Sequence, residues 1–447
     1  MDKKMKYFMF LSLFMPLILG FPSGEVFANP YAKYSGTTLV VSFPAHAQYD
    51  AAAKLIPEFT TKTGIKVEID KVDYVKIHDK QVLEMSKPKG DYDVVGYLIA
   101  NKTEYVSKGF LAALAPFLAN PSLSDPSYDL EDIVPVYRES LGMVGGKKGY
   151  LAGPGAALYA IPFAGQTSIF AYRKDIFDKH GLKPPKTYDE MLNIARTIRE
   201  KEPGMYGLTM QAEVGHHVSH SYLNHGGEAF DDNWEPIFHK ERSINVINTM
   251  KEILKTGPPG IQTFAYGGAV NAFVLGQASM YSDATVIYGS ANNPATSKII
   301  GKVGYAPPPI PKGYSTPKAQ TGGFAMAIPQ NSTKKEAAFL FIQWLTSKEN
   351  DRKIIAHGGM PNRMSTFNDP EMQKQNPMFQ IMVEVLKYAN PDFRPLIPEW
   401  PEISINHIGV AVHEALLGKK TPEKAMGDIV EPVKKIMEKG GYYTWKR

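Results

Sequence analysis

Apolar and polar positions follow two rhythms along the chain, one typical of buried strands and the other of amphipathic helices. Residues 38–43 (TLVVSF) form a continuous apolar run that predicts a strand, and residues 51–63 carry an apolar stripe that predicts a helix. The same patterns continue with a strand at 66–69, a helix at 74–85 and a strand at 92–97. This alternation of strand and helix predicts a parallel sheet flanked by helices.

In the middle of the chain the pattern begins again. Two short runs rich in β-branched and aromatic residues, 158–163 and 169–172, predict strands, and a short helix then ends at Gly181. Thr187 is placed to cap the next helix, with Glu190 at the capping-box position. We interpret this stretch as the point where the chain crosses from one lobe to another, with a ligand cleft between them.

The later patterns predict a second lobe and further crossings. Helices are expected at 188–200, 244–254, 334–345, 405–417 and 422–438, and strands at 206–210, from 278 onward and at 321–328. The predicted division is a signal peptide at 1–28, an N-lobe from 29–163 and 323–363, and a C-lobe from 164–322 and 364–447, the last part including closing helices. Short extended crossings between interleaved lobes predict a hinge.

The first 28 residues have the pattern of an export signal. Lys3, Lys4 and Lys6 precede an apolar run at 7–19, and Val26 and Ala28 occupy the small-residue positions of a cleavage site. An uncleaved membrane anchor is the alternative, but the run is short for a bilayer span. The 447-residue chain has no cysteine, so neither a lipid anchor at the cleavage site nor a disulfide is available. We expect a periplasmic protein.

Composition and charge exclude other classes. The formal net charge is +5, and no basic run with interleaved aromatic residues occurs, so nucleic acid is not an expected partner. The glycine-rich stretch 145–155 lacks the spacing of a phosphate-binding loop and is interpreted as a hairpin turn. No GxSxG-type motif for a serine nucleophile is present. The pairs at 189–190 and 231–232 are better explained as a capped helix start and a turn than as acid/base carboxylates.

The histidines and tryptophans leave alternatives open. His216, His217, His220 and His225 cluster on one predicted helix, and the i, i+4 spacing of His216 and His220 is compatible with zinc, with a solute pocket or with a solvated helix face. We expect no bound metal. Three tryptophans are expected in the core, whereas the fourth, in a polar proline-rich loop, suits a pocket or the core equally. The core set is Trp234, Trp344 and Trp445, and the open case is Trp400.

Six segments in order resemble the family 1 extracellular solute-binding proteins of ABC importers, the group that includes maltose- and other sugar-binding proteins. They are 55–67, 159–163 (YAIPF), 171–177 (AYRKDIF), 184–190 (PPKTYDE), 273–280 (FVLGQASM) and 334–347. Tyr188 stands where the family usually has Trp. The resemblance implies a two-lobe α/β periplasmic binding protein fold (type II-like), each lobe a mainly parallel sheet flanked by helices, hinged by crossing strands. It also implies a monomer without catalytic residues or cofactor, and a membrane permease as partner.

The expected solute-binding residues come from loops at strand ends, where open parallel sheets bind ligands, and from positions that the resemblance implies. The full set is Phe43, His46, Gln48, Asp73, Tyr74, Tyr97, Gln166, Thr167, Gln211, His216, Asp283, Thr285, Gly322, Gly323, Arg363 and Trp400. Polar side chains of these types hydrogen-bond hydroxyl groups, and aromatic rings cover C–H faces, so a carbohydrate or polyol is the expected solute. The chain lacks Trp in the loops of Tyr97 and Asp283, which disfavours a long glucan.

Two other functions stay open at this point. The same fold could bind an organic anion or a metal complex, because Arg363, Arg394 and the histidines offer suitable groups. An exported glycoside hydrolase would need two carboxylates in one cleft, and Asp283 with Glu399 is the pair to test.

Overall fold

The computed structural model describes residues 29–73, 76–146 and 151–444. The predicted signal peptide, Tyr74 and Trp445 therefore lie outside the described residues. Within those ranges, no helix combines the length and the apolar character needed to cross a membrane.

A sheet of the first lobe begins with three parallel strands in the order β2-β1-β3, and continues with β10 and β6, which run antiparallel to their neighbours. The strands are β1 (Thr38–Pro44), β2 (Lys66–Val72), β3 (Val94–Leu98), β6 (Ala160–Arg173) and β10 (Thr321–Ala327). The predicted strand–helix–strand–helix–strand order is confirmed. Its helices and those packed beside them are α1 (Ala47–Thr63), α2 (Ile77–Met85), α3 (Lys102–Ser107), α4 (Ala115–Leu118), α5 (Pro135–Tyr137), α12 (Lys335–Leu345) and α13 (Lys348–Ala356).

The first helix starts earlier than the pattern predicted, and the cause is its cap. The ring nitrogen Nδ1 of His46 accepts a hydrogen bond from the backbone N–H of Gln48 at 3.2 Å, so α1 begins at Ala47. Gly64 ends the helix with φ of 72°. His46 is thereby fixed directly after β1, at the edge of the sheet where the site is expected.

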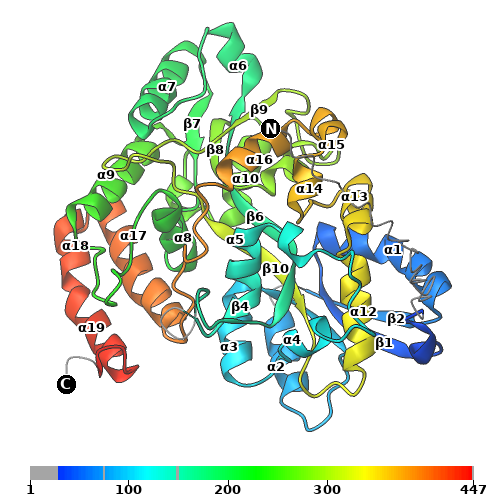
Figure 1. The fold of residues 1–447 in the computed structure, drawn as a ribbon. Helices are drawn as coiled ribbons and strands as arrows, with labels where there is room; N and C mark the ends of the chain where they lie inside the picture. Colours follow the sequence, from blue (N-terminus) through cyan, green and yellow to red (C-terminus); the bar gives the residue numbers. More distant parts are fainter. Residues whose placement is uncertain (1–28, 74–75, 147–150, 445–447) are drawn as a thin grey trace, which may run out of the picture.

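The central strand β6 joins the two lobes. Its residues 160–167 pair with β10, and residues 168–173 pair with β8 and β9 of the second sheet. The prediction of two separate strands is wrong, because the small and polar residues between the two apolar runs continue the strand where the lobes meet, and all of them except the half-buried Gln166 are buried. Pro162 does not break it, since the pairing shifts register beside it. Figure 1 shows β6 and β10 between the first-lobe elements α1 and α12 and the second-lobe elements α7 and α9.

The second sheet places β8 between β6 and β7, with β9 on the other side of β6. Its strands are β7 (Tyr206–Thr209), β8 (Ala278–Ala284) and β9 (Val303–Ala306). The helices of this part of the chain are α6 (Lys174–Lys179), α7 (Tyr188–Lys201), α8 (His216–Asn224), α9 (Glu241–Thr256), α10 (Tyr266–Val274), α11 (Ile287–Ala291), α14 (Met364–Phe367), α15 (Pro370–Gln375), α16 (Met378–Val385), α17 (Val410–Leu416), α18 (Pro422–Asp428) and α19 (Val430–Lys439). Thr187 caps α7 as predicted, with its side chain accepting from the N–H of Glu190.

Short elements complete the chain. The 3-10 turns are η1 (Ala32–Tyr34), η2 (Ile99–Asn101), η3 (Leu130–Asp132) and η6 (Ile261–Thr263), and the π-helical turns are η4 (Arg138–Gly142) and η7 (Glu402–Gly409). Two-residue strands β4 (Met143–Val144) and β5 (Ala157–Leu158) pair antiparallel, which confirms the predicted hairpin across the glycine-rich stretch. The helix predicted at 422–438 is divided at Ile429 into α18 and α19. The predicted lobe boundaries stay predictions.

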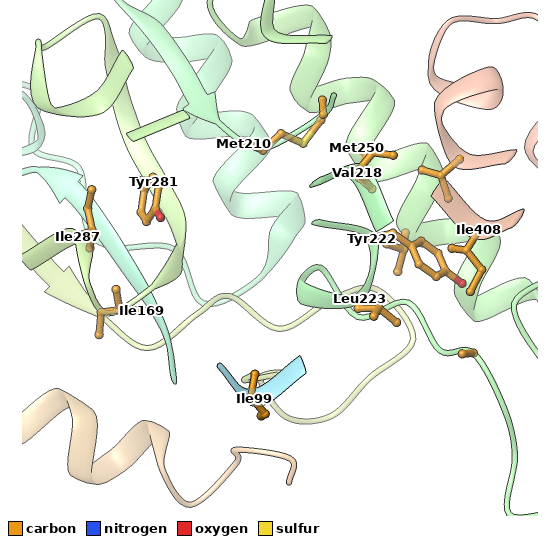
Figure 2. Close-up of a cluster of buried hydrophobic side chains, with 14 of the residues drawn as sticks. Ile99, Ile169, Met210, Val218, Tyr222, Leu223, Met250, Tyr281, Ile287 and Ile408 are labelled. Carbon is orange, nitrogen blue, oxygen red and sulfur yellow. The ribbon is translucent and has the colours of Figure 1, made fainter. Parts of the chain in front are cut away.

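Two clusters of buried apolar side chains form the core. The first contains Phe59, Phe341 and Trp344, with ring centroids of Phe59 and Trp344 5.0 Å apart. The second runs from the inner face of the first sheet into the second lobe, where Val218 and Met250 gather with other side chains (Figure 2). Trp234 and Trp344 are each 6% exposed, which confirms their predicted core positions.

Candidate functional site

A cavity of about 340 Å³ lies where the two sheets meet at β6 and β10. One wall comes from the first lobe and is apolar apart from one imidazole: Ala45, His46, Leu98, Ile99, Ala100 and Phe324. The opposite wall comes from the second lobe and is polar: Gln211, His216, His217, His220, Tyr266 and Asp283. β6, β10 and the residue before β10 supply Gln166, Gly322, Gly323 and Gln320, and Arg394 comes from the loop between α16 and η7.

Two larger hollows contain none of the predicted site residues. One, of about 410 Å³, is lined by the loop 226–234 and by residues 390–395, and the other, of about 700 Å³, lies beside the start of α12. Of these three cavities in the described part of the chain, the 340 Å³ one alone is lined by predicted site residues. We therefore take this cavity as the candidate site.

Asp283, near the end of β8, is the centre of the polar wall. Its Oδ1 accepts hydrogen bonds from Nε2 of Gln320 at 2.8 Å, from Nε2 of His220 at 3.0 Å and from the backbone N–H of Ala284 at 2.8 Å. Its Oδ2 accepts from Nε2 of Gln211 at 2.7 Å. Burial pushes the pKa of Asp283 upward, but the charge of His220 and these hydrogen bonds outweigh it and lower the pKa to about 2. Asp283 is therefore a carboxylate at any physiological pH.

Two other imidazoles in the cavity wall, those of His216 and His46, have lowered pKa values. Burial, with the positive charges of Arg394, His220 and His217, lowers the pKa of His216 to about 3. Burial also lowers the pKa of His46 on the facing wall. Because Nδ1 of His46 accepts from a backbone N–H, the proton of its neutral ring sits on Nε2, which can donate. The site can thus both donate and accept hydrogen bonds without adding charge.

Two neighbouring glycines of β10 form part of the cavity wall. Gly323 has φ of 104°, and a Cβ added there would lie 1.9 Å from the carbonyl oxygen of Ala164, so only glycine fits. A Cβ added to Gly322 would have Nη2 of Arg394, at 3.6 Å, as its nearest neighbour. The close antiparallel pairing of β10 with β6 therefore depends on Gly323.

The structure brings a part of the predicted set together in this cavity: His46, Gln166, Gln211, His216, Asp283, Gly322 and Gly323. Their role in binding stays a prediction. His217, His220, Tyr266, Gln320 and Arg394 also line the cavity and were not in the set. The i, i+4 spacing of the histidines was a usable signal for His220. The sequence carried no comparable signal for Gln320, which precedes the double glycine of β10.

Three aromatic residues of the predicted set belong to the core instead, which corrects their expected position. Phe43 is 1% exposed and its ring packs 4.8 Å from that of Tyr49. Tyr97 is fully buried and its hydroxyl donates to the carbonyl of Leu141 at 2.5 Å. Trp400 is 7% exposed within the second cluster. Their side chains face away from the cavity because alternate positions of a strand, or the inner side of a loop, pack on the core.

The expected positions of two long polar residues are also corrected, because the side chains of both make hydrogen bonds to backbone atoms instead of lining the cavity. The side-chain amide of Gln48 makes two hydrogen bonds with the backbone of Met360, of 3.0 and 2.7 Å. Arg363 is 1% exposed and donates to the carbonyls of Thr346 and Asp129 and to the carboxylate of Asp132.

The remaining predicted residues lie off the cavity wall. The backbone N–H of Thr285 donates to the carbonyl of Thr167 at 2.8 Å, and the hydroxyl of Thr167 donates to the carbonyl of Gln320. These threonines do not line the cavity, but they make hydrogen bonds that connect to Gln320, which does. Asp73 is exposed at the end of β2 and does not line the cavity. Tyr74 lies outside the described residues.

Asp283 and Glu399, the carboxylate pair that a hydrolase would need, do not line the same cavity. Glu399 accepts a hydrogen bond from Tyr442 at 2.8 Å and does not line the cavity that contains Asp283. The described part of the chain holds no group of three or more histidine, cysteine, aspartate or glutamate side chains able to bind a metal ion.

Comparison with known proteins identifies the class. A family model of bacterial extracellular solute-binding proteins matches residues 44–352, and the chain belongs to this family. It is 27% identical over 417 residues to a probable amino-acid ABC transporter periplasmic-binding protein of Sinorhizobium fredii, covering 92% of this chain and 91% of the relative.

Two further proteins are relevant. The chain is 29% identical over 355 residues to an erythritol/L-threitol-binding protein of Mycolicibacterium smegmatis, covering 76% of this chain and 73% of the relative. A solved ABC transporter solute-binding protein of Agrobacterium radiobacter K84, in complex with ribitol, is 28% identical with a TM-score of 0.76, covering 90% of this chain and 99% of that one. The predicted two-lobe α/β fold is confirmed.

Proposed function

We propose that the chain is the solute-binding component of an ABC importer and captures a small sugar or polyol between its two lobes. The observation that carries this proposal is the 340 Å³ cavity whose polar wall, from one lobe, faces a largely apolar wall from the other. A polyol presents hydroxyl groups and C–H surface together, which suits such a pair of walls. The erythritol/L-threitol-binding relative and the ribitol-bound structure support the same solute class.

The size of the cavity supports a small solute. Ligand pockets typically measure about 300 to 1,000 Å³, and a cavity of 340 Å³ is at the lower end of that range. A single monosaccharide or a sugar alcohol fits such a volume better than an oligosaccharide. The absence of Trp from the loops at Tyr97 and Asp283 agrees with this choice.

The mechanism is capture by hinge closure, without chemistry on the solute. Closing the lobes removes the solute from water, which strengthens each hydrogen bond to the polar wall. The chain would act as a monomer in the periplasm after export, and deliver the solute to a membrane permease. The basic and apolar pattern of residues 1–28 supports export.

A second candidate is an organic anion with the same fold and mechanism. Arg394 lines the cavity beside several histidines, and a guanidinium is a natural partner for a carboxylate. The Sinorhizobium fredii relative, described as a probable amino-acid transporter component, is compatible with this candidate.

A thermal-shift screen separates the two. Erythritol, ribitol, mannitol and hexoses would be tested beside amino acids and the aldonic acids of the same carbon number, and hits would be measured by titration calorimetry. Saturable binding of polyols or sugars supports the first proposal, whereas binding confined to the carboxylates supports the second. Turnover of a nitrophenyl glycoside panel would contradict both.

A further inference from the structure

We propose that the start of α3 in the first lobe and the loop 390–397 of the second lobe form a clasp between the lobes, which sets how long a solute stays in the cavity. The clasp is made by Lys102 and Thr103 on one side and by Asp392 and Leu396 on the other, and none of the four lines the cavity. This inference rests on the proposed function, because it assigns the closure of the lobes to particular contacts.

The loop 390–397 is held by the second lobe. The helix before it, α16, packs beside β6 and β9, and the turn after it, η7, packs against α8. Within the loop, the ring of Phe393 lies 6.0 Å from that of His220 on α8. The backbone N–H of Asn390 donates to the carbonyl of Ala319 at 3.0 Å, in the segment that leads into β10. The loop therefore moves with the second lobe when the lobes separate.

The clasp contains a hydrogen bond from the first lobe to this loop. The hydroxyl of Thr103, the second residue of α3, donates to the backbone carbonyl of Leu396. Thr103 is 3% exposed and Leu396 is 4% exposed, so water is excluded from the bond. A buried hydroxyl or carbonyl that loses its partner costs more free energy than an exposed one. The bond therefore stabilises the arrangement in which the lobes are in contact.

A charge pair lies beside this hydrogen bond. Lys102 is 2% exposed, and its Nζ donates to the carbonyl of Met143 on β4 at 2.9 Å, which fixes the start of α3 within the first lobe. Burial lowers the pKa of Lys102 to about 7, and the negative charge of Asp392 on the loop opposes this lowering. Below that pH the ammonium group of Lys102 and the carboxylate of Asp392 attract each other across the lobes.

The same two segments also form the wall of the cavity, so the clasp and the solute are coupled. Residues 98–100 line the cavity directly before the start of α3, and Arg394 lines it from the middle of the loop. The neighbours of Arg394, Phe393 and Pro395, line the 410 Å³ cavity instead. The loop thus separates two cavities, and the space on both sides allows it to move when the clasp opens.

The consequence is kinetic. A solute enters before the lobes close, so contacts that form on closure act on its release more than on its capture. Weakening the clasp should raise the dissociation rate constant and leave the association rate constant unchanged. A residue that only stabilises the fold of one lobe would change neither.

The first test is Thr103→Val, which keeps the branched shape and removes the hydroxyl. Both rate constants would be measured by stopped-flow fluorescence with whichever of erythritol, ribitol, mannitol and the hexoses binds most tightly. Loss of one hydrogen bond predicts a dissociation rate constant raised about 2- to 10-fold, with an unchanged association rate constant.

Thr256→Val is the matched control for this test. Thr256 is 8% exposed, and its hydroxyl donates to the carbonyl of Ile253 within the same helix, α9. We expect both rate constants of this control to equal those of the unmodified protein. An unchanged dissociation rate for Thr103→Val, or an equal increase in the control, would overturn the inference.

The second test is a double-mutant cycle at pH 6 with Asp392→Asn and Lys102→Met. Asp392→Asn should raise the dissociation rate constant by up to about fivefold in the unmodified background. It should have no effect in the Lys102→Met background, because the attraction between the two side chains is already absent there. An equal effect in both backgrounds would refute the pairing across the lobes.

The outcomes separate this inference from the function on which it rests. If the unmodified protein binds no sugar or polyol, the proposed function fails. If it binds one and Thr103→Val releases it at the unmodified rate, the function stands and the inference fails. Melting curves of all variants accompany the kinetics, and if Thr103→Val does not fold, the dissociation rate of Asp392→Asn decides.

Discussion

Replacing Gly323 by alanine tests, with a single methyl group, how closely β10 must pair with β6. Gly323 lies in β10 opposite Gly165 of β6, and its φ is 104°. An added Cβ would meet the carbonyl oxygen of Ala164 at 1.9 Å, far inside any contact that folded proteins tolerate. The atom it meets belongs to the backbone of the strand that joins the lobes, so relief requires β6 and β10 to move apart.

The expected cost has two parts. A non-glycine residue at such a φ costs on the order of 1 to 3 kcal/mol, and forcing an extra methyl group into a closely packed site costs about 1 to 3 kcal/mol more. The free energy of unfolding should therefore fall by about 2 to 6 kcal/mol. Gly322→Ala is the matched control, because its Cβ would have 3.6 Å to its nearest neighbour. Alanine in place of glycine within a strand changes stability by only about 0.5 to 1 kcal/mol, in the favourable direction.

The assay is urea unfolding at 25 °C, followed by far-ultraviolet circular dichroism and tryptophan fluorescence. A lower midpoint with an unchanged denaturant slope reports a loss of stability. The reasoning would be refuted if Gly323→Ala lay within 1 kcal/mol of the unmodified protein, or if Gly322→Ala lost as much.

Three further predictions concern residues that the structure places away from the cavity. Trp400→Ala should lower the free energy of unfolding by about 3 to 5 kcal/mol and leave the solute affinity of the folded protein unchanged. Urea unfolding and calorimetry measure the two quantities. Weakened binding with unchanged stability would show that Trp400 belongs to the pocket. Arg363→Met removes the ion-pair partner of Asp132, which then keeps only its two hydrogen bonds from Ser365, and should lower the free energy of unfolding by about 3 to 5 kcal/mol. An unchanged urea midpoint would contradict the structural role of Arg363. Burial raises the pKa of Asp351 from 3.8 to about 6, so the folded state binds the proton more tightly than the unfolded state, and stability should fall as the pH rises from about 4 to about 6. Urea midpoints measured at pH 4, 5, 6 and 7 should show that Asp351→Asn removes this fall in stability. An identical fall in the variant would show that Asp351 is not its cause.

The scaffold was largely predictable from the sequence because its signals are local. The apolar run at 38–43, the helix before Gly64 and the cap at Thr187 depend on neighbouring residues only, and each is confirmed. β6 was predicted as two strands because its middle, from Ala164 to Ser168, carries small and polar residues that no local rule assigns to a strand. Those residues are extended, and all except the half-buried Gln166 are buried, because the two lobes meet around them.

The site was less predictable because residue type does not report which way a side chain points. Trp400 and Arg363 have the chemistry of sugar-binding residues, yet one fills the core and the other bonds backbone carbonyls. Gln320 has no distinguishing motif, and its position beside Asp283 follows from a contact between residues 37 positions apart. His216 and Asp283 were predictable because helix starts and strand ends near a sheet edge collect polar side chains facing the same space.

The strand shared by both sheets determines where the chain can be opened for engineering. β6 gives its first half to one sheet and its second half to the other, so no single cut yields two fragments that each own a complete sheet. A split-protein sensor divided between the lobes would leave unpaired strand edges on both pieces. A fluorescent reporter belongs instead in an exposed turn such as the one at Gly418, between α17 and α18, where permutation of the chain leaves every strand pairing intact.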